Sequence, residues 1–384
     1  MNIIDRLTDL FTPVKVLPEG VYHLQAPAGD EKPFRLHLRL QKNGAGILIL
    51  NASTVLQLNP TAAEYAFHFI KGLDANDAAK AISSRYRIGK SQALQDYTEF
   101  VEKILALIHS TDLDPVSVLG FGLVQPNSAD LSAPLRLDCA LTYRLTPGSD
   151  PFNAPIKRVE RELTTAEWQI VMDKAWAAGI PHIVFTGGEA TLREDLPVLV
   201  AHAEKNGQVA GLLTDGNKLS DSSYLDNLLQ TGLDHLMIVL PSEGDPNWQA
   251  VSNVVCADIF FSVHLTVTPQ NATRAEDLIA KICEVGVKNI SMSVSTSALQ
   301  AQVLHLMDYA AKMGLNLVSD LPVPYSSAHP VAFEAFEDAE PVGAGKSWLY
   351  VEPDGDVLPA QGCADQIMGN ILTDSWETIY PVTR

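Results

Sequence analysis

Seven short apolar runs follow one another between residues 134 and 340, and segments with helical patterning separate them. The runs lie at Leu135–Leu141, His182–Phe185, Ala210–Thr214, His235–Leu240, Phe261–Val267, Asn289–Val294 and Leu315–Ser319. The clearest helices between them are expected at Thr165–Ala178 and Ala275–Val285. Because parallel neighbouring strands need a crossover helix, this alternation predicts an α/β fold with a parallel barrel or partial barrel.

The second of these runs leads into Phe185-Thr-Gly-Gly-Glu-Ala-Thr-Leu-Arg-Glu-Asp-Leu196. Two adjacent glycines let the backbone approach a ligand closely. Glu189 then places a carboxylate at the end of the strand. Since ligands of α/β folds bind at the carboxyl ends of the strands, the sequence predicts a ligand site at this turn.

The string FTGGE followed by TLREDL resembles the radical S-adenosylmethionine superfamily. The resemblance implies a partial (β/α) TIM-like barrel and a turn that holds the methionine amino group of S-adenosylmethionine. It also implies a set of ligand positions, some of which are vestigial if the site is no longer used. These positions are Gly187, Gly188, Glu189, Thr214, Gly216, Ser242 and Asn271. For Gly216 and Asn271 the alternative is that both are ordinary turn residues.

The same resemblance requires a CxxxCxxC motif after the first strand, where three thiolates hold an iron–sulfur cluster. Alignment places Leu145, Ser149 and Phe152 at these three positions, and none of them replaces a thiolate well. Cys139 lies earlier, inside the strand, and is expected to be a small core residue. We therefore expect no cofactor and no metal site, with the cluster absent and S-adenosylmethionine binding still possible.

The segment from Lys346 to Gln361 reads as a β-hairpin with a tight turn at Asp354-Gly355. Together with the later GNILTDSWETIY it resembles the SPASM or twitch extensions that follow many peptide-modifying radical barrels. Those extensions have a cysteine for an auxiliary cluster where this chain has Ala360.

The first part of the chain has a different pattern: short strands, at Phe34–Leu40, Gly46–Leu50 and Thr54–Leu58, followed by three helices. The phrases ILNASTVLQLNPTAAEY and SSRYRIGKSQALQDY resemble PqqD-like domains, small α+β winged-helix units that hold leader segments of ribosomally made peptides. The resemblance implies that a peptide adds as a strand beside the last strand of the sheet. The implied contact residues are Thr54, Val55, Leu56, Gln57, Leu58, Tyr97 and Val101. Alternatively, Val55, Leu56 and Leu58 only pack the core of the unit.

These patterns divide the chain into four parts. Residues 1–110 form the PqqD-like unit, and 111–133, rich in Pro, Ser, Gly and Asn, form a linker. Residues 134–340 form the degenerate barrel, and 341–384 form the SPASM/twitch-like extension without cluster cysteines.

Charge and composition restrict the classes of partner and the compartment expected for this chain. The net charge of −19 over 384 residues would repel phosphate backbones, so nucleic acid is not an expected partner. No apolar run approaches the length of a membrane span, and four cysteines without a CxxC pair suit a reduced cytoplasm. Residues Ile3 to Phe11 place apolar side chains at helical spacing, which predicts a docking helix.

From these features we expect a cluster-free pseudoenzyme that is not itself a catalyst. It would recognise a ribosomally made peptide, dock an active radical S-adenosylmethionine enzyme, or both, in the maturation of a peptide or a peptide-derived cofactor. A homo-oligomer is the alternative to a separate protein partner. Two other functions stay open: an active S-adenosylmethionine-binding enzyme with unusual cluster ligation or non-radical chemistry, and a sensor of a peptide or metabolite.

Overall fold

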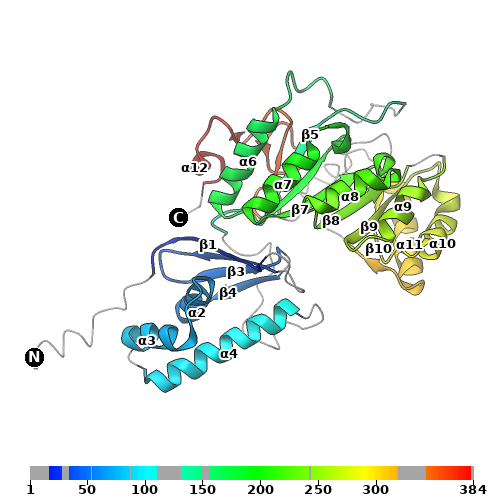
Figure 1. The fold of residues 1–384 in the computed structure, drawn as a ribbon. Helices are drawn as coiled ribbons and strands as arrows, with labels where there is room; N and C mark the ends of the chain where they lie inside the picture. The colour runs from blue at the N-terminus through cyan, green and yellow to red at the C-terminus, as the bar shows by residue number, and fades with distance from the viewer. Residues whose placement is uncertain are drawn as a thin grey trace, which may run out of the picture. The chain divides into compact units, whose positions relative to one another are not determined.

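A computed structural model describes residues 17–27, 34–52, 54–86, 88–109, 131–148, 155–241, 244–318 and 343–381. The chain divides into two compact units, residues 1–129 and 130–384 (Figure 1). The predicted docking helix at residues 3–11 and most of the predicted linker lie outside the described residues.

The first unit contains a four-stranded antiparallel sheet in the order β1-β2-β3-β4. Its strands are β1 Gly20–Gln25, β2 Arg35–Leu40, β3 Gly46–Leu50 and β4 Thr54–Leu58. The sequence predicted the last three of these, and β1 was missed. Gly20–Gln25 pairs along its whole length with β2, and this pairing makes the segment a strand.

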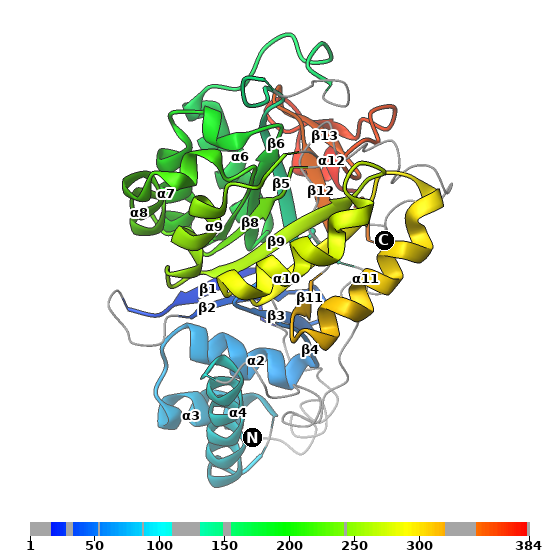
Figure 2. The ribbon, with the colours of Figure 1, turned by 90° about the vertical axis from the view of Figure 1, so that its right-hand side faces the viewer.

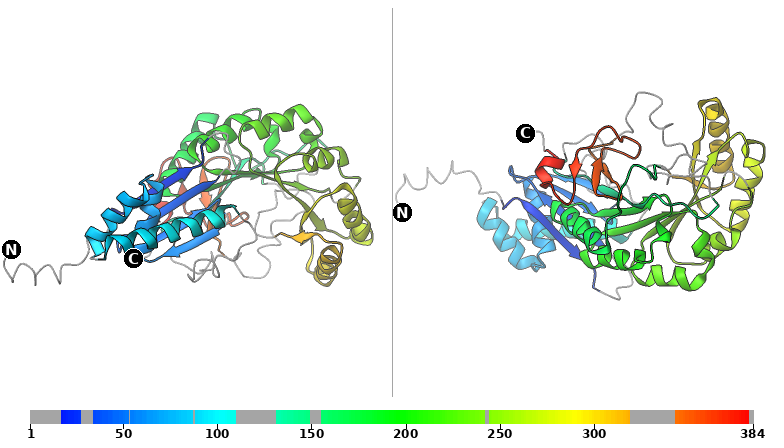
Figure 3. Two further views of the ribbon diagram at one scale, coloured as in Figure 1. Left: turned by 60° about the horizontal axis from the view of Figure 1, so that its bottom comes forward. Right: turned by 90° about the horizontal axis from the view of Figure 1, so that it is seen from above.

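Three helices follow the sheet: α2 Pro60–Ile70, α3 Ala75–Tyr86 and α4 Lys90–His109. Helix α2 begins where its sequence dictates, because the Asn59 side chain accepts a hydrogen bond from the Ala62 N–H (2.9 Å) and Pro60 occupies the first turn. One face of the sheet packs on these helices through Leu38, Leu48 and Leu56 (Figures 1 and 3). The unit therefore has its own core.

The second unit is built on a ten-stranded sheet in the order β11-β10-β9-β8-β7-β6-β5-β12-β13-β14. Its strands are β5 Arg136–Thr142, β6 His182–Gly187, β7 Val209–Thr214, β8 His235–Val239, β9 Phe260–Val267, β10 Asn289–Val294, β11 Asn316–Leu317, β12 Trp348–Val351, β13 Asp356–Leu358 and β14 Gly369–Asn370. Strands β5 to β11 are all parallel to their neighbours. The predicted α/β class with a large parallel sheet is therefore confirmed.

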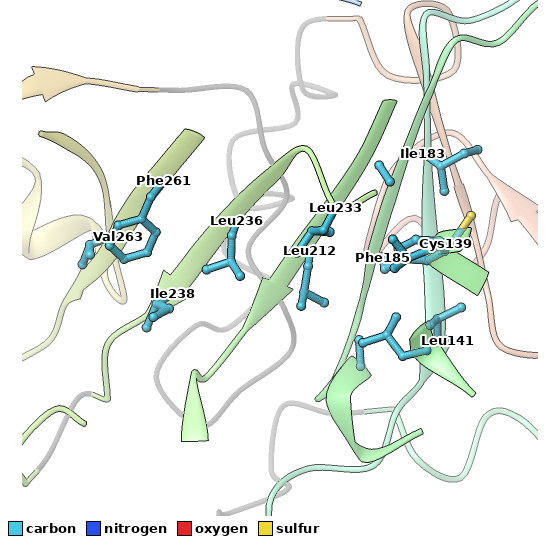
Figure 4. Packing of buried hydrophobic residues seen from close by; sticks show 14 of the residues in the cluster. Cys139, Leu141, Ile183, Phe185, Leu212, Leu233, Leu236, Ile238, Phe261 and Val263 are labelled. Carbon is cyan, nitrogen blue, oxygen red and sulfur yellow. The ribbon is translucent and has the colours of Figure 1, made fainter. Parts of the chain in front are cut away.

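Helices connect these strands and cover one face of the sheet (Figures 2 and 3). They are α6 Thr165–Ala178, α7 Leu196–Asn206, α8 Ser222–Gln230, α9 Trp248–Val255, α10 Ala275–Val285 and α11 Gln300–Lys312, and a short α12 Trp376–Ile379 follows near the end. The side chains of the strands alternate between the face that the helices cover and the opposite face. Ile183 and Phe185 of β6 point into the helix-side core with Leu212 of β7, while Val184 belongs to a separate cluster on the other face (Figure 4).

The hairpin β12–β13 is attached to the first barrel strand. Strand β12 pairs in parallel with β5, Trp348 opposite Arg136 and Val351 opposite Cys139. Beyond β12, the buried Glu352 accepts a hydrogen bond from the Tyr143 hydroxyl (2.7 Å) and pairs with Arg158 (2.6 Å). Residues near the C-terminus therefore belong to the same sheet as the barrel strands.

None of the helices in the described ranges combines the length and the apolar character that a bilayer crossing requires.

The core of the second unit leads to a stability prediction. Trp168 of α6 is fully buried, whereas Ile170 on the same helix is 48% exposed. We expect Trp168→Ala to lower the free energy of unfolding by about 3–5 kcal/mol, because it removes a large side chain from a packed interior. Ile170→Ala should cost less than about 0.5 kcal/mol. Urea unfolding followed by far-UV circular dichroism measures both; equal costs would contradict the helix orientation.

Candidate functional site: the turn after strand β6

The turn after β6 is clasped to the loop that follows β5. The Gly188 N–H donates to the Thr142 carbonyl and the Glu189 N–H donates to the Arg144 carbonyl, both at 2.8 Å. A Cβ atom on Gly187 would lie 2.2 Å from the Thr142 oxygen, and one on Gly188 would lie 2.3 Å from the Arg144 oxygen. The two glycines are thus required by contact with this chain's own backbone, and the close approach of a ligand to them stays a prediction.

The Glu189 carboxylate lies at the end of the strand and is 2% exposed. One oxygen accepts from the Thr191 N–H (2.9 Å), the Thr191 hydroxyl (2.6 Å) and the Thr214 hydroxyl (2.7 Å). The other oxygen accepts from the Asp215 N–H (2.7 Å). These donors come from the turn itself and from the end of β7, so two strand ends together fix the orientation of the carboxylate.

Burial and the nearby Asp215 carboxylate raise the pKa of Glu189 to about 7, although the hydrogen bonds oppose this shift in part. Among the described residues Glu189 has no lysine, arginine or histidine partner. The other buried carboxylates of the described ranges do have one. Glu64 pairs with Arg85, Asp138 with Arg136 and Glu352 with Arg158.

A tyrosine lies close to this carboxylate. The Tyr224 hydroxyl of α8 is buried and has no hydrogen-bond partner among the described residues. Burial raises its pKa, and the negative charge of Glu189 raises it further. The Lys218 ammonium lies 5.4 Å from the centre of the Tyr224 ring. The region thus contains a buried hydroxyl without a partner in the described ranges and a carboxylate without a cation there, polar groups of the kind that a ligand satisfies.

The structure brings most of the predicted ligand positions together. Thr214 donates to Glu189 and accepts from the Gly216 N–H (3.1 Å), so these residues form one network with the glycine turn. Asn271 behaves differently. Its amide donates to the Thr266 carbonyl (2.9 Å) and accepts from the Thr268 N–H (2.9 Å), so it closes its own loop after β9 as a turn residue does. Ser242 lies outside the described residues.

The positions aligned with cluster cysteines are only partly described. Leu145 is half-buried directly after the Arg144 that meets the glutamate turn, and Ala360 is buried after β13. Ser149 and Phe152 lie outside the described residues. Cys139 is fully buried in the helix-side core, where burial raises the pKa of its thiol. The cysteines of the described ranges do not gather into a metal-binding group.

A second polar group lines the sheet face opposite the helices, on β9 and β10. The buried His264 ring lies 3.0 Å from the Ser291 hydroxyl and 2.9 Å from the Ser293 hydroxyl. Ser262, two residues earlier on the same strand face, has a buried hydroxyl without a partner among the described residues. The inner face of this sheet is therefore polar at β9 and β10, whereas β6 to β8 contribute an apolar cluster of Val184, Leu213, Met237 and Val239 together with the His182–His235 pair (2.7 Å).

In the first unit, β4 is an edge strand that pairs only with β3 among the described residues. Gln57 is exposed on it, while Leu56 and Leu58 pack into the unit's own core, as the alternative interpretation stated. Tyr97 is also buried there, with its hydroxyl donating to the Leu73 carbonyl (3.3 Å), and Val101 packs against the same core. Thr54 and Val55 complete the strand. What β4 offers to a peptide is therefore mainly its free backbone edge.

Sequence reasoning missed three residues of the Glu189 network. Thr191 is visible within the TLREDL string, and Asp215 replaces an asparagine of the family pattern, so both carried a signal. Tyr224 carried none, because a tyrosine on an amphipathic helix is ordinarily a core residue.

No family model matches the chain. Among curated proteins, a PqqA peptide cyclase of Xanthomonas campestris pv. campestris (strain 8004) is 25% identical over 283 residues, which covers 63% of this chain and 73% of that protein. A PqqA peptide cyclase of Streptomyces rochei is 26% identical over 255 residues, covering 60% of this chain and 70% of that protein.

Solved structures share the fold. SuiB of Streptococcus suis bound to S-adenosylmethionine aligns with a TM-score of 0.58 and 16% identity over 91% of this chain and 87% of SuiB. SuiB bound to its precursor peptide SuiA aligns with a TM-score of 0.58 and 14% identity over 96% of this chain and 89% of SuiB. At these identities the likeness establishes the fold.

These findings correct one expectation. The prediction of no cofactor, with the iron–sulfur cluster absent, is wrong: SuiB, which has this fold, was crystallised with S-adenosylmethionine, and the family normally carries a cluster. The error was to infer the absence of a cofactor from the missing cysteine motif, although the glutamate turn and its network do not depend on those cysteines. The chain is thus similar in sequence to PqqA peptide cyclases and shares its fold with SuiB.

Proposed function

We propose that this chain binds S-adenosylmethionine at the turn after β6 and takes part in the modification of a ribosomally made peptide. One observation carries the proposal: Glu189 is a buried carboxylate without a cationic partner in the described ranges, whereas the other buried carboxylates there are paired with arginine. An unpaired buried charge is costly, so a cation supplied by a ligand stabilises this site.

The amino group of S-adenosylmethionine is such a cation. Thr191, Thr214 and the Asp215 N–H hold the Glu189 carboxylate in one orientation, so little reorganisation is needed when an ammonium group arrives. The unpartnered Tyr224 hydroxyl adds a polar group beside it. Bound S-adenosylmethionine supplies an activated carbon–sulfur bond. The role of the chain's own residues is to bind and orient the ligand, and no step of the proposed function uses an iron–sulfur cluster.

The peptide is proposed to bind the first unit as an added strand on β4. The free backbone edge of this strand supports the proposal, because an exposed edge accepts an extended peptide through main-chain hydrogen bonds. The names of the relatives and the SuiA peptide bound to SuiB support a peptide substrate as well. Docking of an active enzyme partner, self-association, and the role of a pseudoenzyme stay predictions.

Binding of S-adenosylmethionine can be tested by calorimetric titration. We expect the affinity of the full chain to rise roughly fivefold from pH 6.0 to 7.2, because Glu189 ionises over this range while the ligand's amino group stays protonated. Glu189→Gln should weaken binding and remove the pH dependence. The matched control is Glu194→Gln, which neutralises an exposed carboxylate nearby and should change nothing. Absence of binding at millimolar ligand, or equal affinity of Glu189→Gln and the wild type, would refute the site.

The same carboxylate predicts how stability depends on pH without any ligand. Its folded pKa of about 7 lies above the ordinary value of 4.5, so its stabilising contribution is complete below about pH 4.5 and is lost as the pH rises through 7. From pH 5 to pH 8 the wild type should lose about 2 kcal/mol of unfolding free energy relative to Glu189→Gln. Urea unfolding at four pH values measures this; a constant difference between the two proteins would show that Glu189 stays ionised.

The strand-addition proposal can be tested with peptides selected from a displayed library of random 12-residue sequences on the immobilised full chain. Hydrogen exchange of the complex should show protection of amides in β4, since an added strand hydrogen-bonds that edge. Strand β1, the opposite edge of the same sheet, is the internal control and should exchange at its unliganded rate. Protection at β1, or none in residues 17–109, would overturn this part of the proposal.

A further inference from the structure

A pocket of about 240 Å³ opens between helices α2 and α4 of the first unit. Its inner walls are formed by Ala62 and Tyr65 of α2 and Phe100 of α4. The two aromatic rings lie 5.7 Å apart at an interplanar angle of 66°, and both residues are buried. The inside of the pocket is therefore lined by apolar and aromatic side chains.

The rim of the pocket carries charge. Asp96 and Glu99 line it from α4, together with one cation, Lys103, so the lining has an excess of one negative charge. Among the described residues the Asp96 carboxylate accepts a hydrogen bond from the neutral Gln92 amide (2.6 Å) and has no cationic partner, whereas Glu99 pairs with Lys103 (2.7 Å). The carboxylate of Asp96 is therefore available to a cation that enters the pocket.

The pocket lies beside the edge strand but does not coincide with the predicted peptide contacts. None of its lining residues is among the seven positions that the family resemblance implies for the peptide. Asn59, which lines the pocket and caps α2, directly follows the last residue of β4. A peptide that extends the sheet along β4 would therefore bring side chains near the pocket at the end of that strand.

We propose that this pocket binds the side chain of a lysine or arginine in the peptide that the first unit recognises; the inference rests on the proposed function. Such a side chain has an apolar stem that suits the aromatic walls and a cationic head that suits the acidic rim. A phosphate or a carboxylate ligand would meet Asp96 and Glu99 as like charges, so these classes do not fit. The overall charge of −19 favours approach of a basic segment in addition.

The probe for the test is N-acetyl-lysine methylamide, titrated into the isotope-labelled full chain and followed by nuclear magnetic resonance. The amide signals of Tyr65 and Phe100 should shift, and the dissociation constant should be several-fold lower than for N-acetyl-norleucine methylamide, which lacks the amine. Asp96→Asn should weaken binding of the lysine probe about fivefold, the effect of one charge roughly 4 Å away in a water-like dielectric. Lys103→Met should strengthen binding, because it releases Glu99 from its internal cation.

Glu102→Gln is the matched control. Glu102 is exposed on the same helix outside the pocket lining, so its substitution changes the net charge equally and should leave binding unchanged. The inference is overturned if norleucine binds as tightly as lysine, or if Glu102→Gln weakens binding as much as Asp96→Asn. A single capped residue cannot add as a strand. If the lysine probe binds but peptides do not protect β4 amides from exchange, strand addition is contradicted and the pocket proposal holds. If peptides protect β4 but the lysine probe does not bind, strand addition holds and the pocket proposal is contradicted.

Discussion

Two backbone hydrogen bonds, from the N–H groups of Gly188 and Glu189 to the carbonyls of Thr142 and Arg144, determine where the turn after β6 lies. They are possible because neither Gly187 nor Gly188 carries a side chain that would separate the two segments. The turn after β6 and the loop after β5 consequently form one layer at the end of the sheet. The position of the Glu189 carboxylate follows from this clasp, and Thr214 and Asp215 then complete its hydrogen bonds from the neighbouring strand.

The buried carboxylates with a structural role have a cationic partner, and the carboxylate of the candidate site has none among the described residues. Glu352 is as deeply buried as Glu189, yet Arg158 and the Tyr143 hydroxyl satisfy it, and it holds the region after β12 to the barrel. Asp138 is paired in the same manner by Arg136. Against these two, Glu189 has only neutral donors, and its pKa is raised to about 7 in consequence of burial and of Asp215. An internal comparison of this kind identifies a functional carboxylate more directly than exposure does.

Much of the parallel sheet could be predicted, because its strands stand out as short runs rich in apolar residues between helical segments; the predicted and observed bounds of β10 coincide at Asn289–Val294. Strand β1 was missed, because Gly20–Gln25 is a short segment that becomes a strand through its pairing with β2. At the site, the motif located Glu189 and Thr214. It could not reveal that Glu189 lacks a cation or that Tyr224 lies beside it, because both facts depend on which helix packs over which strand end.

The parallel pairing of β12 with β5 has a consequence for folding. One edge of β5, the first strand of the barrel, pairs with β12, whose residues come about 210 positions later in the chain. In this pairing Trp348 lies opposite Arg136. Such a contact closes a long loop, and sheets with non-local pairing form slowly. During synthesis on the ribosome, the β5 edge therefore stays open until the polypeptide beyond Val351 has emerged, whereas residues 17–109, whose pairings are all between sequence neighbours, can assemble far earlier.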